Sequence, residues 1–258
     1  MSGLLPLTVV VPVYHEEESI AETLARLRDE VAVPHDVLVV YDEEDDPTLP
    51  VVRGLAGAHP NVELVFNDVR RGVIGAIRKG FQVACERHGD DGAVLVVMAD
   101  LSDDLAKVEA MHRMLEEGYD LVAGSRYSPG GEQHGGGWIK SRLSRLAGRS
   151  LAALTDLPTR DCTNAFRIYR TSFLRRVRVE STGGFELSLE LTVKAWAHGF
   201  RVGEVPSVWR DREAGRSKFR LVAWLPRYLR WYLLALGHHY LGLEVGDPPA
   251  EPTRSWEG

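Results

Sequence analysis

The regular alternation of short apolar runs with helical patterns in the first half of the chain restricts its fold more than any other feature. Four runs rich in β-branched residues predict buried strands, at residues 7–13, 36–41, 62–66 and 93–98. Apolar residues at helical spacing predict helices after them, at 19–31, 49–58, 75–87 and 107–117. With a short strand at 121–123, this order predicts an α/β fold with a parallel sheet and crossover helices.

The second half of the chain begins differently, with the glycine-rich stretch 128–137 (SPGGEQHGGG), which predicts a flexible loop. A helix is expected at 142–154, and strands near 166–169 and 201–206. No repeat or linker separates two folding units, so residues 1–218 are expected to form one domain with halves at 1–127 and 128–218. An amphipathic helical segment at 219–245 and a disordered tail at 246–258 complete the expected organisation.

Three acidic loops follow the predicted strands, at residues 14–18, 42–46 and 100–104. Ligands of such sheets bind at the carboxyl ends of the strands, where these loops would meet. Three acidic loops would repel a bare phosphate, but they suit a divalent cation or hydrogen bonds to a base and a ribose. Solvated turns would explain one loop by itself, but they explain three at equivalent positions less well.

Charge is unevenly distributed along the chain, whose formal net charge is -6. Residues 140–180 contain ten bases and only three acids. This asymmetry indicates either two differently solvated faces or an anionic ligand on the basic side. No basic run is interleaved with aromatic residues, so we expect no nucleic-acid partner.

Features that would indicate secretion or a membrane span are absent from the sequence. Cys85 and Cys162 lie in no C-x-x-C motif, so neither a disulfide framework nor a zinc site is predicted. The first seven residues do not resemble a signal peptide. The uncharged run 231–243 is shorter than the roughly 20 apolar residues that a spanning helix needs. We therefore expect a cytoplasmic protein.

Ten short motifs occur in an order that matches a known family. The first half contains PVYHE (12–16), YDEEDDPT (41–48), GVIGAIRKG (72–80), MADLS (98–102) and GSRY (124–127). The second half contains Gly137-Trp138 with Arg142, DCTNAFRIYR (161–170), Phe185 with Glu190, GEVP (203–206) and REAGRSK (212–218). Over residues 7–220 the chain resembles the inverting glycosyltransferase family 2, within it the branch of dolichol-phosphate mannosyltransferases and bacterial polyprenyl-phosphate glycosyltransferases.

The resemblance implies a GT-A fold, in which a mostly parallel, Rossmann-like sheet is flanked by helices. It implies transfer of a hexose from a nucleotide sugar of the GDP-mannose or UDP-glucose type to a polyprenyl or dolichyl phosphate. It also implies the residues that bind the nucleotide sugar: Pro12, Tyr14, Glu16, Asp42, Gly72, Lys79, Ala99, Asp100, Ser102 and Lys218. The carboxylates of Glu16 and Asp42 would accept hydrogen bonds from the base or the ribose, and Tyr14 would stack on the base.

A divalent metal, Mg²⁺ or Mn²⁺, is expected at the end of the strand 93–98. Such an ion neutralises the charge that grows on a pyrophosphate leaving group. Asp100 is the first candidate ligand, although a carboxylate here would also suit a helix N-cap. The family has an aspartate where this chain has Met98, and Ser102 stands where the narrower branch often has glutamine. Ser102 and Asp103 complete the expected ligand set, with Asp104 as an alternative to Asp103.

The acceptor is expected to be a lipid phosphate. The resemblance assigns Arg126, Arg142 and Arg212 to the acceptor phosphate or the donor pyrophosphate, and arginine binds phosphate bidentately. A phosphate already carries negative charge and needs no general base. A sugar hydroxyl would need one, for which Asp161 and Glu190 are the candidates, unless they form structural salt bridges.

The segment 219–236 combines aromatic residues and leucines with three arginines that fall within an arc of roughly 80° on a helix. This pattern favours contact with a membrane surface, in which case the protein would be peripheral on the cytoplasmic face. A helix that packs in the core or forms a dimer is the alternative. Pro226 predicts a break into two helices or the start of the second.

Three other functions remain open at this point. The fold could transfer sugar to a hydroxyl of a small molecule or a glycan. It could be a catalytically inactive nucleotide-sugar-binding module, which Met98 motivates. A Rossmann oxidoreductase is disfavoured, because the first strand is followed by VYHE rather than by a glycine-rich phosphate turn.

Overall fold

The computed structural model describes residues 4–183, 186–211, 221–246 and 248. Their centre is a seven-stranded sheet with the strand order β3-β2-β1-β4-β7-β5-β8. The strands are β1 (Leu7–Pro12), β2 (His35–Tyr41), β3 (Val62–Phe66), β4 (Ala93–Val96), β5 (Leu121–Ser125), β7 (Arg167–Arg170) and β8 (Val202–Pro206).

Six of the seven strands run in the same direction. β1 pairs in parallel with β2 and β4, β2 with β3, and β5 with β8, whereas β7 is antiparallel to both β4 and β5. The carboxyl ends of the six parallel strands therefore lie at one edge of the sheet. This arrangement confirms the predicted α/β class with a mostly parallel sheet.

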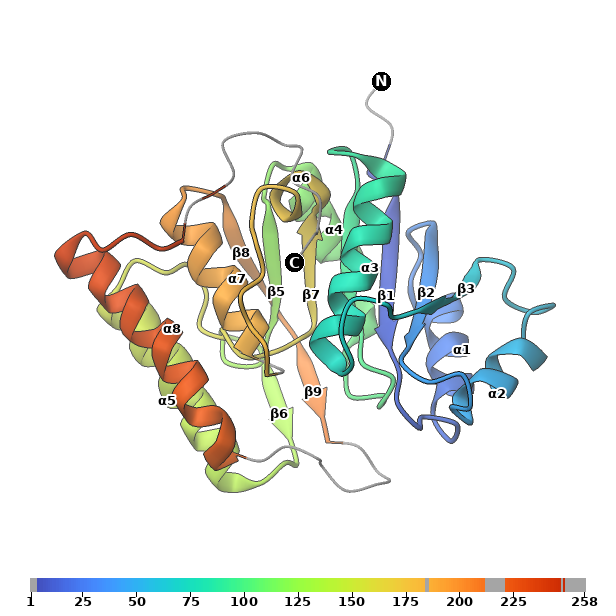
Figure 1. Cartoon of the computed structure of the whole chain (residues 1–258). Coiled ribbons are helices and arrows are strands. Elements are labelled where there is room, and N and C mark those ends of the chain that lie inside the picture. Colours follow the sequence, from blue (N-terminus) through green and yellow to red (C-terminus); the bar gives the residue numbers. More distant parts are fainter. Residues whose placement is uncertain (1–3, 184–185, 212–220, 247, 249–258) are drawn as a thin grey trace.

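Helices cover both faces of the sheet (Figure 1). One face is covered by α1 (Ile20–Glu30), α2 (Thr48–Gly54), the short 3₁₀ helix η1 (Leu105–Lys107) and α4 (Val108–Glu116). The other is covered by α3 (Val73–His88), α6 (Thr171–Leu174) and α7 (Glu186–Ala197). Alternate residues of β1 follow this division: Val9 and Val11 pack on the first face and Val10 on the second. Because both faces are buried, the strands have continuous apolar runs.

Two long helices, α5 (Trp138–Leu154) and α8 (Leu221–Leu241), lie side by side and extend away from the sheet (Figure 1). A small apolar cluster that includes Leu151, Val193 and Trp231 joins them to α7. The predicted break at Pro226 is wrong, since the proline lies inside one continuous helix. Proline has a helical φ and removes only one backbone hydrogen bond, and the packing of Trp231 farther along holds the helix in place.

A small two-stranded sheet replaces part of the predicted flexible loop. β6 (Glu132–His134) pairs in parallel with β9 (Val208–Arg210), so that this part of the prediction is wrong. The glycines allow the chain to turn tightly there: a Cβ on Gly131 would lie 2.2 Å from the carbonyl oxygen of Ser125. Pairing with a distant strand is invisible in the local sequence.

Two other details of the secondary structure concern the helices. α2 ends at Gly54, earlier than the predicted residue 58. Within the described residues, no helix combines the length and the hydropathy needed to cross a membrane.

Candidate active site

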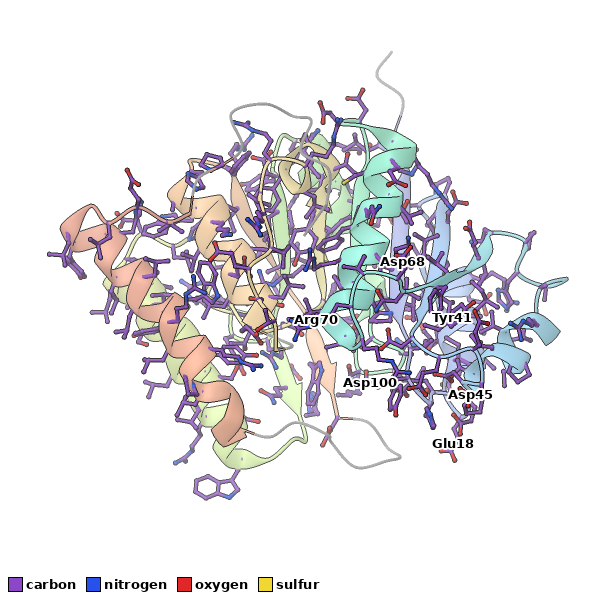
Figure 2. The ribbon with its side chains drawn as sticks, in the orientation of Figure 1. Glu18, Tyr41, Asp45, Asp68, Arg70 and Asp100 are labelled. Atoms are coloured by element: carbon purple, nitrogen blue, oxygen red, sulfur yellow. The ribbon has the colours of Figure 1, made fainter. Side chains whose placement is uncertain are left out.

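A cleft of about 820 Å³ lies at the edge of the sheet where the parallel strands end. Figure 2 shows Glu18, Asp45 and Asp100 at this end of the strands, on three different loops. The opposite wall is formed by α5, β6, β9 and α8. The cleft brings together many of the residues that the sequence predicted for the site: Pro12, Tyr14, Glu16, Asp42, Gly72, Asp100, Ser102, Asp103 and Arg126.

The loop after β1 is held by the acidic turn after β2. The buried carboxylate of Asp46 accepts hydrogen bonds from the backbone N–H groups of His15 (3.1 Å) and Thr48 (2.8 Å), and Thr48 Oγ1 accepts one from the N–H of Glu16 (2.9 Å). Burial raises the pKa of Asp46, but the hydrogen bonds from Thr48 and His15 outweigh burial and lower it below its usual value. These bonds place Tyr14 and Glu16 at the cleft.

Asp42 organises the loop that precedes α3. Its two carboxylate oxygens accept hydrogen bonds of 2.6 Å from Asn67 Nδ2 and from the backbone N–H of Gly72. Gly72 has a φ of +100°, which an L side chain rarely adopts. A Cβ on Gly75 would lie 1.6 Å from the carbonyl oxygen of Arg70, so this turn requires glycine. Asp42 thus brings the backbone at the start of α3 to the cleft.

The loop after β4 presents two carboxylates. Asp100 Oδ1 accepts hydrogen bonds from the hydroxyl (2.6 Å) and the backbone N–H (3.2 Å) of Ser102. Asp103 accepts the backbone N–H of Met98 at 2.9 Å. Burial, and next the nearby negative charge of Asp100, raise the pKa of Asp103 to about 7. The negative charge of Asp100 disfavours the ionised form of Asp103, and a cation beside them would favour it.

The same loop is fixed from both sides. From α1, Arg26 donates to the carbonyl oxygens of Leu101 and Asp103, both at 3.2 Å. From β9, the N–H of Arg210 donates to the carbonyl of Ser102 (3.2 Å), and the N–H of Val208 donates to Asp104 Oδ2 (3.0 Å). Asp103 lines the cleft and Asp104 does not. Of the two alternatives for the second carboxylate, the geometry favours Asp103.

These donors fit a divalent cation that is completed by a substrate. Among the residues that the structure describes, no group of three or more His, Cys, Asp or Glu side chains could by itself hold a metal ion. Mg²⁺ is commonly bound by only one or two carboxylates together with substrate phosphates. Asp100 and Asp103 provide two such carboxylates, and the Ser102 hydroxyl orients Asp100.

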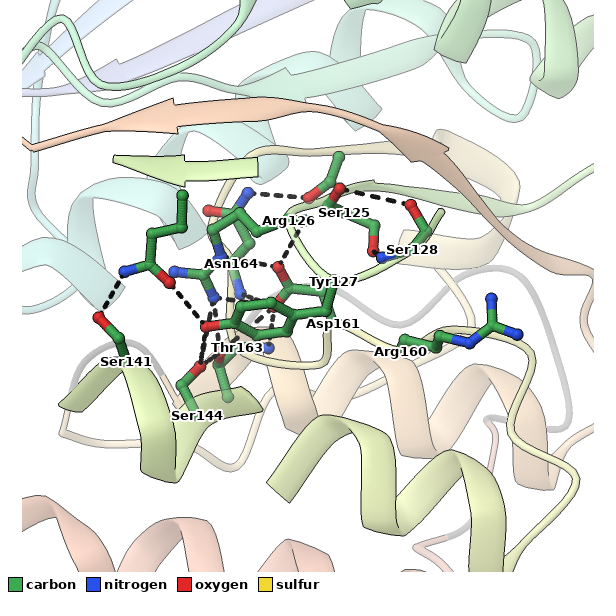
Figure 3. A network of polar contacts seen from close by, with 12 residues as sticks. Ser125, Arg126, Tyr127, Ser128, Ser141, Ser144, Arg160, Asp161, Thr163 and Asn164 are labelled. Atoms are coloured by element: carbon green, nitrogen blue, oxygen red, sulfur yellow. Dashed lines mark hydrogen bonds and ion pairs between the residues drawn. The ribbon is translucent and has the colours of Figure 1, made fainter. Parts of the chain in front are cut away.

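Arg126 and Asp161 form a buried, two-pronged ion pair at the wall opposite the strand ends (Figure 3). Arg126 Nε lies 2.7 Å from Asp161 Oδ2 and Nη2 lies 2.9 Å from Oδ1, while the backbone N–H of Arg126 donates to the same carboxylate at 3.0 Å. Nη2 also donates to Thr163 Oγ1 at 2.8 Å. Burial would raise the pKa of Asp161, but Arg126 lowers it below its usual value. Asp161 is therefore the counter-ion of Arg126.

The ring of Tyr127 lies against both Arg126 and Arg145. The guanidinium carbons of Arg126 and Arg145 lie 4.8 Å and 5.4 Å from the centre of its ring. Its hydroxyl lies 3.1 Å from Gln133 Oε1 and 3.0 Å from Ser144 Oγ. Tyr127 therefore links β6 to α5 at the cleft.

Five predicted site residues that the structure describes do not line the cleft, and Asp161, in the ion pair above, is one of them. Glu190 is buried and accepts the N–H groups of Glu180 (2.6 Å) and Ser181 (2.7 Å). Lys79 pairs with Asp68 at 2.8 Å. Ala99 is buried, and its carbonyl accepts a hydrogen bond from Thr23 Oγ1. Arg142 is exposed on α5, beside the Trp138 ring. Arg212 and Lys218 lie outside the described residues.

Several residues of the opposite wall were not predicted from the sequence. Asp211 and Trp209 reach the cleft from the end of β9, and Tyr228 and Leu225 reach it from α8. The Asp211 carboxylate accepts the backbone N–H of Gly136 at 3.0 Å. Asp211 directly precedes the motif at 212–218, and Tyr228 lies in the aromatic segment 219–236. The sequence around each therefore gave a weak indication that it belongs to the site.

Comparison with known proteins identifies the family. The sequence profile of "Glycosyl transferase family 2" matches residues 8–178. The chain belongs to glycosyl transferase family 2. This result confirms the resemblance, and the protein is a glycosyltransferase.

Two bacterial relatives are similar over most of their length. An undecaprenyl-phosphate mannosyltransferase of Micrococcus luteus is 34% identical over 81% of this chain and 85% of its own. A polyprenol monophosphomannose synthase of Mycolicibacterium smegmatis is 31% identical over 81% of this chain and 79% of its own. A dolichol-phosphate mannosyltransferase of Pyrococcus furiosus is 25% identical over 88% of this chain, but the match spans only 64% of that longer protein.

Solved structures of similar fold include glucosyl-3-phosphoglycerate synthase of Mycobacterium tuberculosis. Its complex with Mn²⁺, UDP-glucose and phosphoglyceric acid gives a TM-score of 0.64 at 17% identity, over 91% of this chain and 80% of that one. Another structure of the same enzyme contains Mg²⁺ with UDP. At this identity the likeness shows the GT-A fold alone.

Proposed function

We propose that this glycosyltransferase moves a hexose from a nucleotide sugar to a polyprenyl phosphate. The observation that carries the proposal is one cleft with two different walls. Carboxylates line one wall, and Arg126 with leucines of the helices α5 and α8 lines the other. The names of the relatives support the acceptor, because they act on undecaprenyl phosphate, polyprenol and dolichol phosphate.

The proposed division of labour follows the two halves of the chain. Residues 1–127 would bind the donor, with Tyr14 and Glu16 at the nucleoside and the start of α3 near the phosphates. Residues 128–218 would bind the acceptor, with Arg126 at their boundary and Arg142, Arg212 and Lys218 as further anion-binding candidates. Segment 219–245 would contact the membrane.

Asp100 and Asp103 would hold a divalent cation against the donor pyrophosphate. The solved structures that contain Mn²⁺ or Mg²⁺ with UDP ligands support this proposal. When bound, the ion supplies neutralisation of the negative charge that grows on the leaving pyrophosphate. Ser102 would keep Asp100 oriented through its 2.6 Å hydrogen bond.

The acceptor phosphate would attack without a general base. Its oxygen forms a bond to the anomeric carbon while the bond from that carbon to the donor pyrophosphate breaks, and a nucleoside diphosphate leaves. A phosphate monoester has a second pKa of about 6 and is already anionic at neutral pH. This route agrees with the ion pairing of Asp161 and the burial of Glu190, which leave neither carboxylate at the cleft as a base.

A peripheral position on a membrane would bring the lipid acceptor to the cleft. α5 and α8 contain no Asp or Glu, and exposed leucines lie along both: Leu143, Leu146, Leu154, Leu225, Leu229 and Leu233. Leu225 and Leu143 also line the cleft, so the apolar surface is continuous with it. An apolar face flanked by arginines is typical of helices that lie in the interface of a bilayer.

One assay tests the reaction. Purified protein is incubated with radiolabelled GDP-mannose or UDP-glucose, Mg²⁺ or Mn²⁺ and undecaprenyl phosphate in detergent. Label that moves into the organic phase as an acid-labile sugar phospholipid is the expected result. Soluble glycosides as the only products would contradict the lipid-phosphate acceptor. Thermal shifts with GDP, UDP, dTDP and CDP, with and without metal, name the donor base, because a ligand of the folded state raises the Tm.

A hydroxyl acceptor is the second candidate, and Asp211 favours it. This carboxylate lines the acceptor side of the cleft and could take a proton from a sugar hydroxyl. The Asp211→Asn variant separates the two reactions. Its transfer rate should fall by at least about a hundredfold if Asp211 is a general base, and should change little if a phosphate attacks.

A further inference from the structure

A second hollow, of about 610 Å³, lies on the far side of Tyr127 from the cleft. Its walls are the C-terminal half of α5, the loops 127–129 and 157–160, and Glu204 of β8. Tyr127 lines both cavities and forms the partition between them. In Figure 3 Arg160 points away from the Arg126–Asp161 network, towards this side of the molecule. We call this hollow the Arg149 pocket.

The Arg149 pocket carries excess positive charge. Among the described residues that line it, Glu204 is the only acid. It accepts hydrogen bonds from the N–H of Arg160 (2.8 Å), from Thr159 Oγ1 (3.1 Å) and from Arg160 Nη1 (3.3 Å), so its charge is already compensated. Within the described part of the chain, Arg149 makes no hydrogen bond or ion pair. Arg149 is exposed, and a guanidinium that lines a cavity without an ion-pair partner favours an anionic ligand.

The pocket continues a basic flank of α5. Arg142, Arg145 and Arg149 follow each other at spacings of three and four residues, which places them on one side of the helix. Arg145 lies over the ring of Tyr127, next to the pocket. The exposed Leu146 is four residues after Arg142 and three before Arg149, so it lies beside this flank. Positive charge and apolar surface therefore run side by side along α5.

We propose that the Arg149 pocket binds the phosphodiester headgroup of an anionic bilayer lipid. The inference rests on the proposed function, in which the leucines of α5 and α8 lie in the membrane interface. With those leucines at the acyl boundary, the arginine flank lies at the level of the headgroups. The planar forks of Arg149 and Arg160 suit a phosphate. The small side chains of Ala152 and Ala153 leave room for it.

The test compares the binding of full-length protein to two kinds of vesicle, phosphatidylcholine alone and phosphatidylcholine mixed with phosphatidylglycerol. Ala152→Phe fills the pocket without changing the charge, and Arg149→Gln removes the charge. Each should weaken binding to the mixed vesicles by about three- to tenfold and leave binding to phosphatidylcholine unchanged. Arg53→Gln, which removes an exposed arginine from the distant α2, is the matched control and should bind like the wild type.

Unchanged binding of Ala152→Phe to the mixed vesicles would overturn the proposal, because diffuse surface charge would then explain the preference. Equal binding of the wild type to both kinds of vesicle would overturn it as well. Thermal unfolding verifies that Ala152→Phe folds, and Ala153→Phe on the exposed part of the same wall replaces it if it does not.

Two further measurements identify the source of the phosphate and separate this proposal from the reaction itself. Glycerol phosphate in solution should neither raise the Tm of the wild type nor release it from mixed vesicles. If it does both, the pocket takes a free phosphate ester and the lipid headgroup is excluded. Transfer to undecaprenyl phosphate in detergent should be equal for the wild type and Ala152→Phe. Loss of transfer in the wild type would instead count against the proposed reaction.

Discussion

The donor edge of the sheet and the helix pair α5–α8 use charge in opposite ways. At the donor edge, the carboxylates of Asp42, Asp46 and Asp103 accept backbone N–H groups from within the loops and hold them in shape. α5 and α8 contain no acid at all, and they expose leucines and arginines. In the proposed function, the first region is an acidic frame for a cation and a sugar nucleotide, and the second is a surface for an anionic, lipid-bearing partner.

The link between the two regions is also electrostatic. Arg126 leaves the end of β5 and pairs with Asp161 beneath α5, and the β6–β9 pair connects the Asp100 loop to the same wall. The two walls of the cleft are therefore held at a fixed spacing by a few buried polar contacts. Substitutions in each region should have different consequences, and four of them test the contrast.

The largest expected effect is that of Asp100→Asn on catalysis. Loss of a ligand charge should weaken binding of the cation at the pyrophosphate. It should lower kcat/KM by about a hundred- to a thousandfold. The metal-dependent Tm shift with the nucleotide should disappear as well. Asp104→Asn is the control, because that carboxylate accepts the N–H of Val208 and does not line the cleft. An Asp100→Asn variant that keeps its metal-dependent shift would remove Asp100 from the ligand set.

The next effect concerns the ion pair between the regions. Asp161→Leu leaves Arg126 buried without its partner and should lower the free energy of unfolding by about 3–5 kcal/mol. Urea denaturation measures this loss. The double variant Arg126→Met with Asp161→Leu should recover much of the stability, because neither member of the pair is then left as a buried charge without its partner. If Asp161→Leu is as stable as the wild type, the Arg126–Asp161 pair does not hold the two walls of the cleft together.

A smaller effect is expected on the apolar surface of α8. Leu229 and Leu233 lie on one side of the helix and are both about half exposed. Replacing both with serine should weaken binding to vesicles by about tenfold or more, since each loses part of the roughly 1.5–3 kcal/mol that full burial of a leucine provides. Leu4→Ser, an exposed leucine far from α8 in sequence, is the control. Unchanged vesicle binding would assign the surface to a second copy or another protein.

The smallest effect tests the rigid frame at the donor edge. Asp46→Asn should lower the free energy of unfolding by about 1 kcal/mol at pH 7, through the weakened hydrogen bonds to His15 and Thr48. The pKa of Asp46 is lower in the folded protein than its usual value of about 3.9. Its stabilising contribution is therefore present above about pH 4 and is lost as the pH falls through the folded pKa.

Urea denaturation at pH 7 and at pH 3 measures this dependence. The difference between the wild type and Asp46→Asn should shrink at the lower pH. Asp45→Asn, at the exposed neighbouring position, should match the wild type at both values. A difference that grows with acid would contradict the assigned direction.

Local sequence determined most of the sheet and the donor side of the cleft. The strands β1 to β4 were predictable because they are short apolar runs that the sheet buries, and the helices between them because their apolar residues repeat about every 3.6 residues. The acidic loops were predictable as neighbours because the carboxyl ends of parallel strands share one edge. Asp100 and Ser102 therefore reached the cleft as expected.

Only the tertiary structure decided which polar residues are available for chemistry. Asp161 and Glu190 look alike in the sequence as candidate bases, yet one is paired with Arg126 and the other accepts the N–H groups of Glu180 and Ser181. The pairing of β6 with β9 and the arrival of Asp211 and Tyr228 at the cleft also depend on residues distant in sequence. Local periodicity reports which face of an element is buried, but hydrogen bonds between distant segments depend on how the elements pack, and no local pattern records that.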